Sequence, residues 1–165
     1  MAQRQQPEPG LVTGVENYLE WAYRDGNLQD EQYLDVVVIC GAKAGESAHN
    51  VAQRASGKMR MLGQEWRERL ERRKGSLRAG EAPACPTIFG FVVKYSVVSV
   101  LSHDAASAQS PVRTLAQMNH NLEGIDVWHA FTISLVCIQA RNRLLQMEAH
   151  GIFDKIHKSV EEADA

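Results

Sequence analysis

The chain has few cysteines, few prolines and no long apolar run. Its 165 residues include 3 cysteines, 5 prolines and 12 glycines, which excludes collagen-like and mucin-like chains. The longest apolar stretch, Ala130–Ile138, is interrupted by Thr132 and Ser134 and is far shorter than the roughly 20 residues that span a bilayer. The N-terminal sequence MAQRQQPEPG is polar and lacks the apolar core of a secretory signal. We therefore expect an intracellular protein of the cytoplasm or nucleus, without a membrane partner.

The cysteine pattern argues against a disulfide framework. Three is an odd number of cysteines, and the sequence contains no CxxC pair. Cys40 and Cys137 lie within apolar runs, which predicts that both are buried free thiols. Cys85 lies in the sequence Ala-Pro-Ala-Cys-Pro, which is typical of an exposed loop.

The composition fits a single globular domain. Hydrophobic residues make up 44% of the chain and charged residues 23%, so enough apolar surface is available to offset the loss of chain entropy. We expect a disordered N-terminal lead over residues 1–10, one domain over residues 11–162 and a short tail over residues 163–165.

Hydrophobic periodicity predicts a helix, a strand, a long helix, three strands, a second long helix and a short helix. The first helix has Thr13 as its N-cap and Glu16 three residues later, which is a capping-box pattern. This order predicts an α/β (α+β) fold, in which a small central sheet is flanked by two long helices. The predicted ranges are Thr13–Arg24, Tyr33–Cys40, Ser47–Lys74, Ile88–Val93, Val97–Leu101, Val112–Met118, Ile125–Glu148 and Ile152–Glu162.

Both long helices carry an apolar stripe that favours packing against the sheet. Gly57 and Gly63 weaken the helix over Ser47–Lys74, and we expect them to mark a close approach to the sheet. One face of the second long helix carries Trp128, Phe131, Leu135, Ile138 and Leu145.

Positive charge is concentrated in one segment. Nine basic residues and three glutamates give Arg54–Arg78 a net charge of +6, so the rest of the chain carries −8. Such a segment predicts contact with the phosphates of a nucleic acid or with an acidic protein. The alternative is a solvated helix face, in which Glu65 pairs with Arg69 and Glu68 with Arg72. The candidate binding residues are Arg54, Lys58, Arg67, Arg69, Arg72, Arg73 and Lys74.

A second candidate site lies where the first strand leads into a helix, in the sequence LDVVVICGAKAGE. An acidic residue, a strand, an acid-x-Lys pair and a helix form the core of the PD-(D/E)xK nuclease-like family, which this passage resembles. There, two carboxylates hold Mg²⁺ and the lysine helps to activate the attacking water. Lys43 matches the lysine and Asp35 the first acid, but Gly41 stands where the second carboxylate belongs. A displaced carboxylate, Glu46 or Glu16, is the candidate replacement.

The resemblance extends over residues 14–148. The hairpin sequence containing Phe89, Gly90 and Asp104 is similar to nuclease-like domains of fungal proteins, including those attached to fungal-type kinases. The segment Asp126–Leu145 looks like the closing helix of uncharacterised fungal proteins. This resemblance implies a nuclease-like topology.

Three functions follow as hypotheses. The first is a catalytically inactive nuclease-like module that binds a partner through the basic helix, with no cofactor. The second is an active Mg²⁺-dependent nuclease that uses a displaced carboxylate. The third is an unrelated α+β protein that forms a homodimer through the aromatic residues Tyr18, Trp21 and Tyr23.

The six histidines do not change these hypotheses. They include His103, His120 and His129, but the sequence contains no HxH or HxxxH pair. The spacing typical of a zinc site is therefore absent.

Overall fold

The computed structural model describes residues 8–28, 33–76 and 83–153 of the chain. Its secondary structure consists of three α-helices, one short 3-10 helix and four strands. In chain order these are α1 (Glu8–Asp25), β1 (Val37–Gly41), α2 (Ala48–Arg73), η1 (Lys74–Ser76), β2 (Thr87–Lys94), β3 (Val97–Asp104), β4 (Arg113–Asn119) and α3 (Asp126–Ala149).

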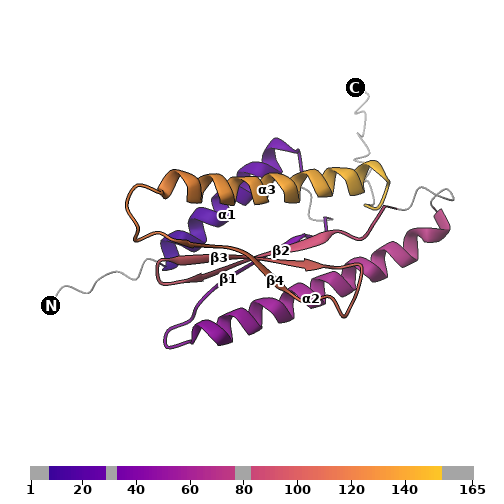
Figure 1. Ribbon diagram of the computed structural model, residues 1–165. Helices are drawn as coiled ribbons and strands as arrows, with labels where there is room; N and C mark the ends of the chain where they lie inside the picture. The colour runs from indigo at the N-terminus through magenta and orange to yellow at the C-terminus, as the bar shows by residue number, and fades with distance from the viewer. Residues whose placement is uncertain (1–7, 29–32, 77–82, 154–165) are drawn as a thin grey trace, which may run out of the picture.

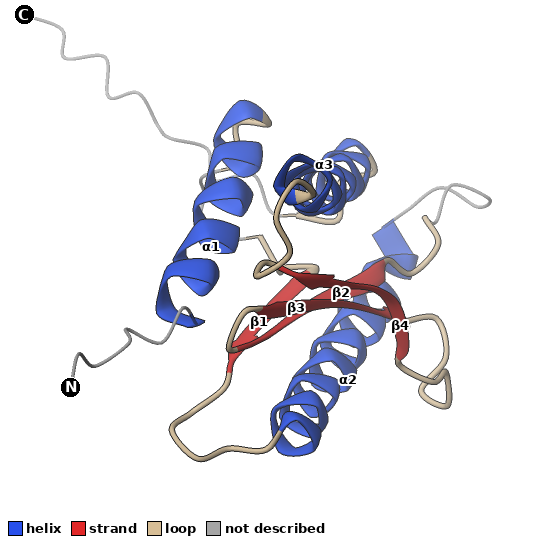
Figure 2. Ribbon diagram, turned by 60° about the vertical axis from the view of Figure 1, so that its left-hand side comes forward, coloured by secondary structure: helices blue, strands red, loops and turns tan. Residues whose placement is uncertain are grey.

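The four strands form one mixed sheet in the order β1-β2-β3-β4. β1 runs parallel to β2, so α2 is the crossover helix between them, and the remaining pairs are antiparallel. Figures 1 and 2 show α2 on one face of this sheet, with α1 and α3 side by side on the other. The α+β class with flanking helices is therefore confirmed, although three helices cover the sheet instead of two. No helix within the described ranges is both long enough and apolar enough to cross a bilayer.

The first helix begins earlier than the capping pattern predicts. α1 starts at Glu8, so Thr13 lies within the helix and the predicted capping box with Glu16 is wrong. Pro9 is compatible with this start, because the first turn of a helix does not need its backbone N–H groups for internal hydrogen bonds. Residues 8–10, predicted as part of a disordered lead, are thus helical.

The second helix agrees closely with its predicted range. Ser47 is the N-cap, and its hydroxyl accepts a hydrogen bond of 3.1 Å from the backbone N–H of Asn50. Gly63 confirms the expected close approach to the sheet, because a Cβ atom there would lie 3.3 Å from the ring of His103 in β3. Gly57 is exposed and has open space around it, so for this glycine the expectation is wrong. The buried line of α2 consists of Val51, Ala55, Met59, Gly63 and Trp66.

The third helix buries a different face from the one that its largest apolar residues form. Trp128, Phe131 and Leu135 are 68%, 53% and 46% exposed. The helix is apolar on more than one side, and the side that faces inward carries small and large residues alike. The buried residues of α3 are His129, Ile133, Cys137, Ala140, Leu144 and Met147.

The remaining predictions concern the strands, the thiols and the C-terminus. All four strands are present, but β1 begins at Val37, four residues later than predicted. Cys40 and Cys137 are buried free thiols, as predicted, whereas Cys85 is half-buried. Ile152 and the following residue, the start of the predicted last helix, are not helical. The rest of that helix and the predicted tail over residues 163–165 lie outside the described residues.

Candidate functional site

Asp35, the first acid of the predicted nuclease motif, joins three elements of the fold. It lies just before β1, and its Oδ1 accepts hydrogen bonds from the backbone N–H groups of Val36 (2.7 Å) and Val37 (2.9 Å). The same oxygen accepts a 2.5 Å hydrogen bond from the phenol of Tyr23 on α1. Its backbone carbonyl accepts a 2.7 Å hydrogen bond from the indole N–H of Trp66 on α2. Asp35 therefore acts as a structural junction, and these bonds explain why the strand starts only after it.

Glu46, a candidate replacement carboxylate, lies in an ion pair. Nη2 of Arg54 donates to its Oε2 at 2.8 Å, and Nε of Arg54 donates to its Oε1 at 3.2 Å. The backbone N–H of Lys43 also donates to Oε2, at 2.8 Å. The hydrogen bonds from Arg54, followed by that from Lys43, lower the pKa of Glu46 to about 2. The carboxylate is therefore ionised and engaged within the loop that leads into α2.

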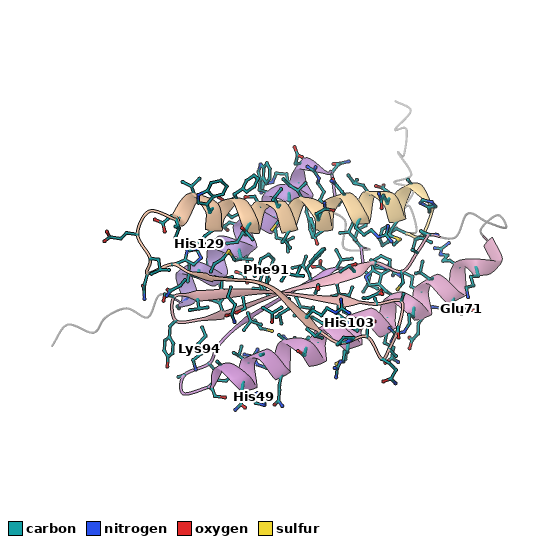
Figure 3. The ribbon with its side chains drawn as sticks, in the orientation of Figure 1. His49, Glu71, Phe91, Lys94, His103 and His129 are labelled. Atoms are coloured by element: carbon teal, nitrogen blue, oxygen red, sulfur yellow. The ribbon has the colours of Figure 1, made fainter. Side chains whose placement is uncertain are left out.

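The same loop is tied to the sheet by two further bonds. Arg54 donates from Nη2 to the carbonyl of Gly41 at 2.8 Å, and Nζ of Lys94 donates to the carbonyl of Glu46. Figure 3 shows Lys94 between the end of the sheet and the N-terminal turns of α2. This cluster orders the connection from β1 to α2.

The structure does not assemble the four predicted catalytic residues at one point. Asp35 precedes β1 and Lys43 follows it, and the strand alone extends about 13 Å at roughly 3.3 Å per residue. Glu16 lies exposed on a different element, α1. Glu46 lies near Lys43, but it contacts the backbone N–H of Lys43, and the side-chain partner of its carboxylate is Arg54.

Most of the candidate basic residues on α2 have contacts within the chain. Arg54 pairs with Glu46, and Nη1 of Arg67 donates to the carbonyl of Ala105 at 2.7 Å. The guanidinium of Arg69 lies 5.7 Å from the ring centroid of Phe153. Nε of Arg72 donates to the carbonyl of Glu68, Lys74 pairs with Glu71, and Arg73 is also engaged. Lys58 is exposed. These basic side chains therefore hold α2 against neighbouring parts of the chain, and they also make the surface of α2 positive.

A group of exposed apolar side chains lies on α1 and α3, on the opposite side of the sheet from α2. We call this surface the outer apolar face; its six residues are named at the end of this paragraph. A groove of about 500 Å³, lined by Gly14, Asn17, Tyr18, Trp21 and Ser134, runs between the two helices. Tyr23, the third aromatic residue predicted for this surface, turns inward to Asp35 instead. The outer apolar face consists of Tyr18, Trp21, Val127, Trp128, Phe131 and Leu135.

A second groove, of about 420 Å³, lies on the α2 side of the sheet. α2 packs mainly over β1 and β2, which leaves part of β3 and β4 uncovered. Lys94 lies in the wall of this groove, but its amine is held by the carbonyl of Glu46 and lies 4.9 Å from the ring centroid of Tyr95. The apolar part of the lining comes from Ala48, Val51, Ala52, Val92, Val97 and Leu101.

One cluster with metal-binding chemistry was not expected from the sequence. His120, Asp126 and His129 each offer a ligand atom, and these atoms lie within 4.8 Å of one another. The residues come from the end of β4 and the first turn of α3. Their spacing matches no local zinc pattern, so only the turn between strand and helix brings them together. The signal for this cluster in the sequence is that an aspartate, Asp126, lies between the two histidines.

Comparisons with protein-family models, with curated proteins and with solved structures found no match for this chain. The nuclease-like resemblance therefore stays a prediction from the sequence.

Proposed function

We propose that this chain is an interaction module that binds a second copy of itself through the outer apolar face. The observation that carries the proposal is the exposure of four neighbouring apolar side chains on α3 together with Tyr18 and Trp21 on α1. Monomeric proteins rarely expose a contiguous apolar patch of more than a few hundred Å², and larger patches mark interaction sites.

The size of the face agrees with this proposal. Its six side chains are between 37% and 78% exposed. Because an aromatic side chain offers roughly 150–250 Å², the face presents on the order of 600 Å² of apolar surface. A stable interface buries about 800 Å² on each partner, including its polar rim. The outer apolar face is therefore large enough to form the centre of such an interface.

The lack of charge on the face favours a second copy as the partner. α3 contains no Asp, Glu, Lys or Arg from Val127 to Ala140, and the groove between the helices is lined by uncharged residues. In a two-fold dimer the same patch meets itself, so any charge near the axis would face its own copy. An uncharged patch avoids this repulsion. The edge-on packing of Trp128 against Phe131, with ring centroids 6.4 Å apart, gives the face a defined shape.

The experiment is light scattering coupled to size-exclusion chromatography over a wide range of protein concentrations. We expect the wild-type chain to approach twice its mass of 18.4 kDa as the concentration rises. The double variant Trp21→Ser/Phe131→Ser is expected to remain a monomer. The matched control is Met61→Ser, because Met61 is 65% exposed but lies on α2, across the sheet. Circular dichroism confirms that each variant is folded.

A wild-type chain that stays monomeric at every concentration would overturn the proposal. So would a double variant that dimerises as strongly as the wild type, since the contact would then lie elsewhere.

The two nuclease-like hypotheses stay predictions. Binding through α2 is tested by titrating a labelled duplex with wild type and with Arg72→Ala/Lys58→Ala, and the variant should bind less tightly. Mg²⁺-dependent cleavage is tested by comparing wild type with Lys43→Ala, and equal rates would remove that hypothesis.

A further inference from the structure

The corner between β4 and α3 brings two histidines and an aspartate together. β4 ends at Asn119, the chain turns through Gly124, which has a φ of +82°, and α3 begins at Asp126. Asp126 and His129 are three residues apart and so lie on the same side of the helix, while His120 approaches from the strand. The rings of His120 and His129 are 4.7 Å apart between centroids and inclined by 56°.

Two of the ring nitrogens in this corner are buried without a hydrogen-bond partner among the described residues. They are Nε2 of His120 and Nδ1 of His129. His129 is only 7% exposed, so water has little access to its ring. Buried polar atoms are almost always partnered, and a bound ion is one of the standard explanations for an exception. The two rings therefore leave nitrogen lone pairs or N–H groups unused in a corner that also holds the carboxylate of Asp126.

We propose that His120, Asp126 and His129 bind a divalent transition-metal ion, with Zn²⁺ as the best fit. Imidazole nitrogens favour Zn²⁺ and its neighbours over Mg²⁺ or Ca²⁺, which prefer oxygen ligands. Three protein ligands leave one position of a tetrahedral site for water or another ligand.

The three side chains need to move only slightly to coordinate the ion. With Zn–N distances near 2.0 Å, the ligand atoms of a tetrahedral site lie about 3.3 Å apart. The three ligand atoms already lie within 4.8 Å of one another. Asp126 is exposed in the first turn of α3, so its carboxylate is free to rotate inward. Figure 3 shows His129 on the side of α3 that faces the sheet.

The experiment uses the full chain without a histidine tag. After treatment with a chelator and its removal, the protein is titrated with Zn²⁺ by calorimetry, and with Co²⁺ by visible absorption, which reports the coordination number. We expect one ion per chain. The variants Asp126→Asn and His120→Gln should each weaken binding by at least about tenfold. The matched control is His49→Ala, an exposed histidine on α2 on the opposite side of the sheet, which should bind as the wild type does.

Thermal unfolding gives a second readout that does not depend on any activity. Zn²⁺ should raise the melting temperature of the wild type and of His49→Ala, because it binds only the folded state, and should raise that of the two site variants less at the same Zn²⁺ concentration. The proposal is overturned if no saturable binding is found. It is also overturned if both site variants bind Zn²⁺ as tightly as the wild type, because the ion would then sit on other residues.

Discussion

The phenol of Tyr23 donates a 2.5 Å hydrogen bond to Oδ1 of Asp35, and this bond joins α1 to the start of β1. Burial, and then the charge of Asp35, raise the pKa of Tyr23 well above its ordinary value of 10.0. The hydroxyl therefore stays protonated in the folded protein under conditions in which it would ionise in the unfolded chain.

We expect Tyr23→Phe to lower the free energy of unfolding by about 1–3 kcal/mol at neutral pH, because a half-buried carboxylate loses a donor. A raised folded pKa gives stability that is present below the unfolded pKa and lost as pH rises above it. The wild type should therefore lose stability above about pH 10, and the variant should lose less. Urea denaturation over this range measures both. A stability difference that is constant with pH would contradict the expectation.

The ion pair of Glu46 with Arg54 predicts an acid-sensitive contribution to stability. Because the pKa of Glu46 is lowered to about 2 from its ordinary value of 4.5, its contribution is complete above 4.5 and is lost as pH falls toward 2. Carbon-detected NMR titration of the Glu46 carboxyl should give a midpoint near 2 in the wild type. In Arg54→Ala the midpoint should rise toward 4.5. An unchanged midpoint would show that Arg54 does not hold the carboxylate in solution.

The two glycines within α2 should respond differently to alanine. Gly57→Ala is expected to raise the free energy of unfolding by about 1 kcal/mol, because the site is exposed, helical and open. At Gly63 a Cβ atom would lie 3.2 Å from Ala105 and 3.3 Å from the ring of His103, which offsets the helical gain. Chemical denaturation of the matched pair is the measurement. If Gly63→Ala were more stable than Gly57→Ala, the distance between α2 and the sheet at Gly63 would be larger in solution than in the structure.

The thiols should react slowly in the folded protein. Burial, and then the charge of Asp35, raise the pKa of Cys137 to about 12, and burial also raises the pKa of Cys85. With a thiol-specific disulfide reagent at mildly alkaline pH, we expect Cys85 to react first, because it is half-buried, while Cys40 and Cys137 are buried. All three should react at once in denaturant. Rapid reaction of two thiols in the native protein would contradict this order.

Local sequence patterns were sufficient to predict the secondary structure. The β-branched run around Val37, the hairpin of β2 and β3, and the apolar spacing of the two long helices each depend on neighbours in the chain. One error occurred where a distant side chain set a boundary. β1 starts after Asp35 because that carboxylate accepts the N–H groups of the next two residues and the phenol of Tyr23.

The orientation of α3 could not be predicted in the same way. Its sequence is apolar on several sides, so periodicity does not choose which side is buried. Packing against the rest of the fold buries the side with Cys137 and Ala140 and leaves Trp128 and Phe131 at the surface. The outer apolar face is therefore a consequence of packing.

The sequence by itself determined the α+β class, the order of the elements and the burial of two thiols, because these follow from hydrophobic periodicity and local propensity. Only the tertiary structure decided which polar groups meet. It separated Asp35 from Lys43 at opposite ends of β1, joined Glu46 to Arg54, and placed His120 beside Asp126 and His129. The physical reason is that side-chain chemistry depends on distances of a few ångströms between elements, and those distances are set by how helices pack on the sheet.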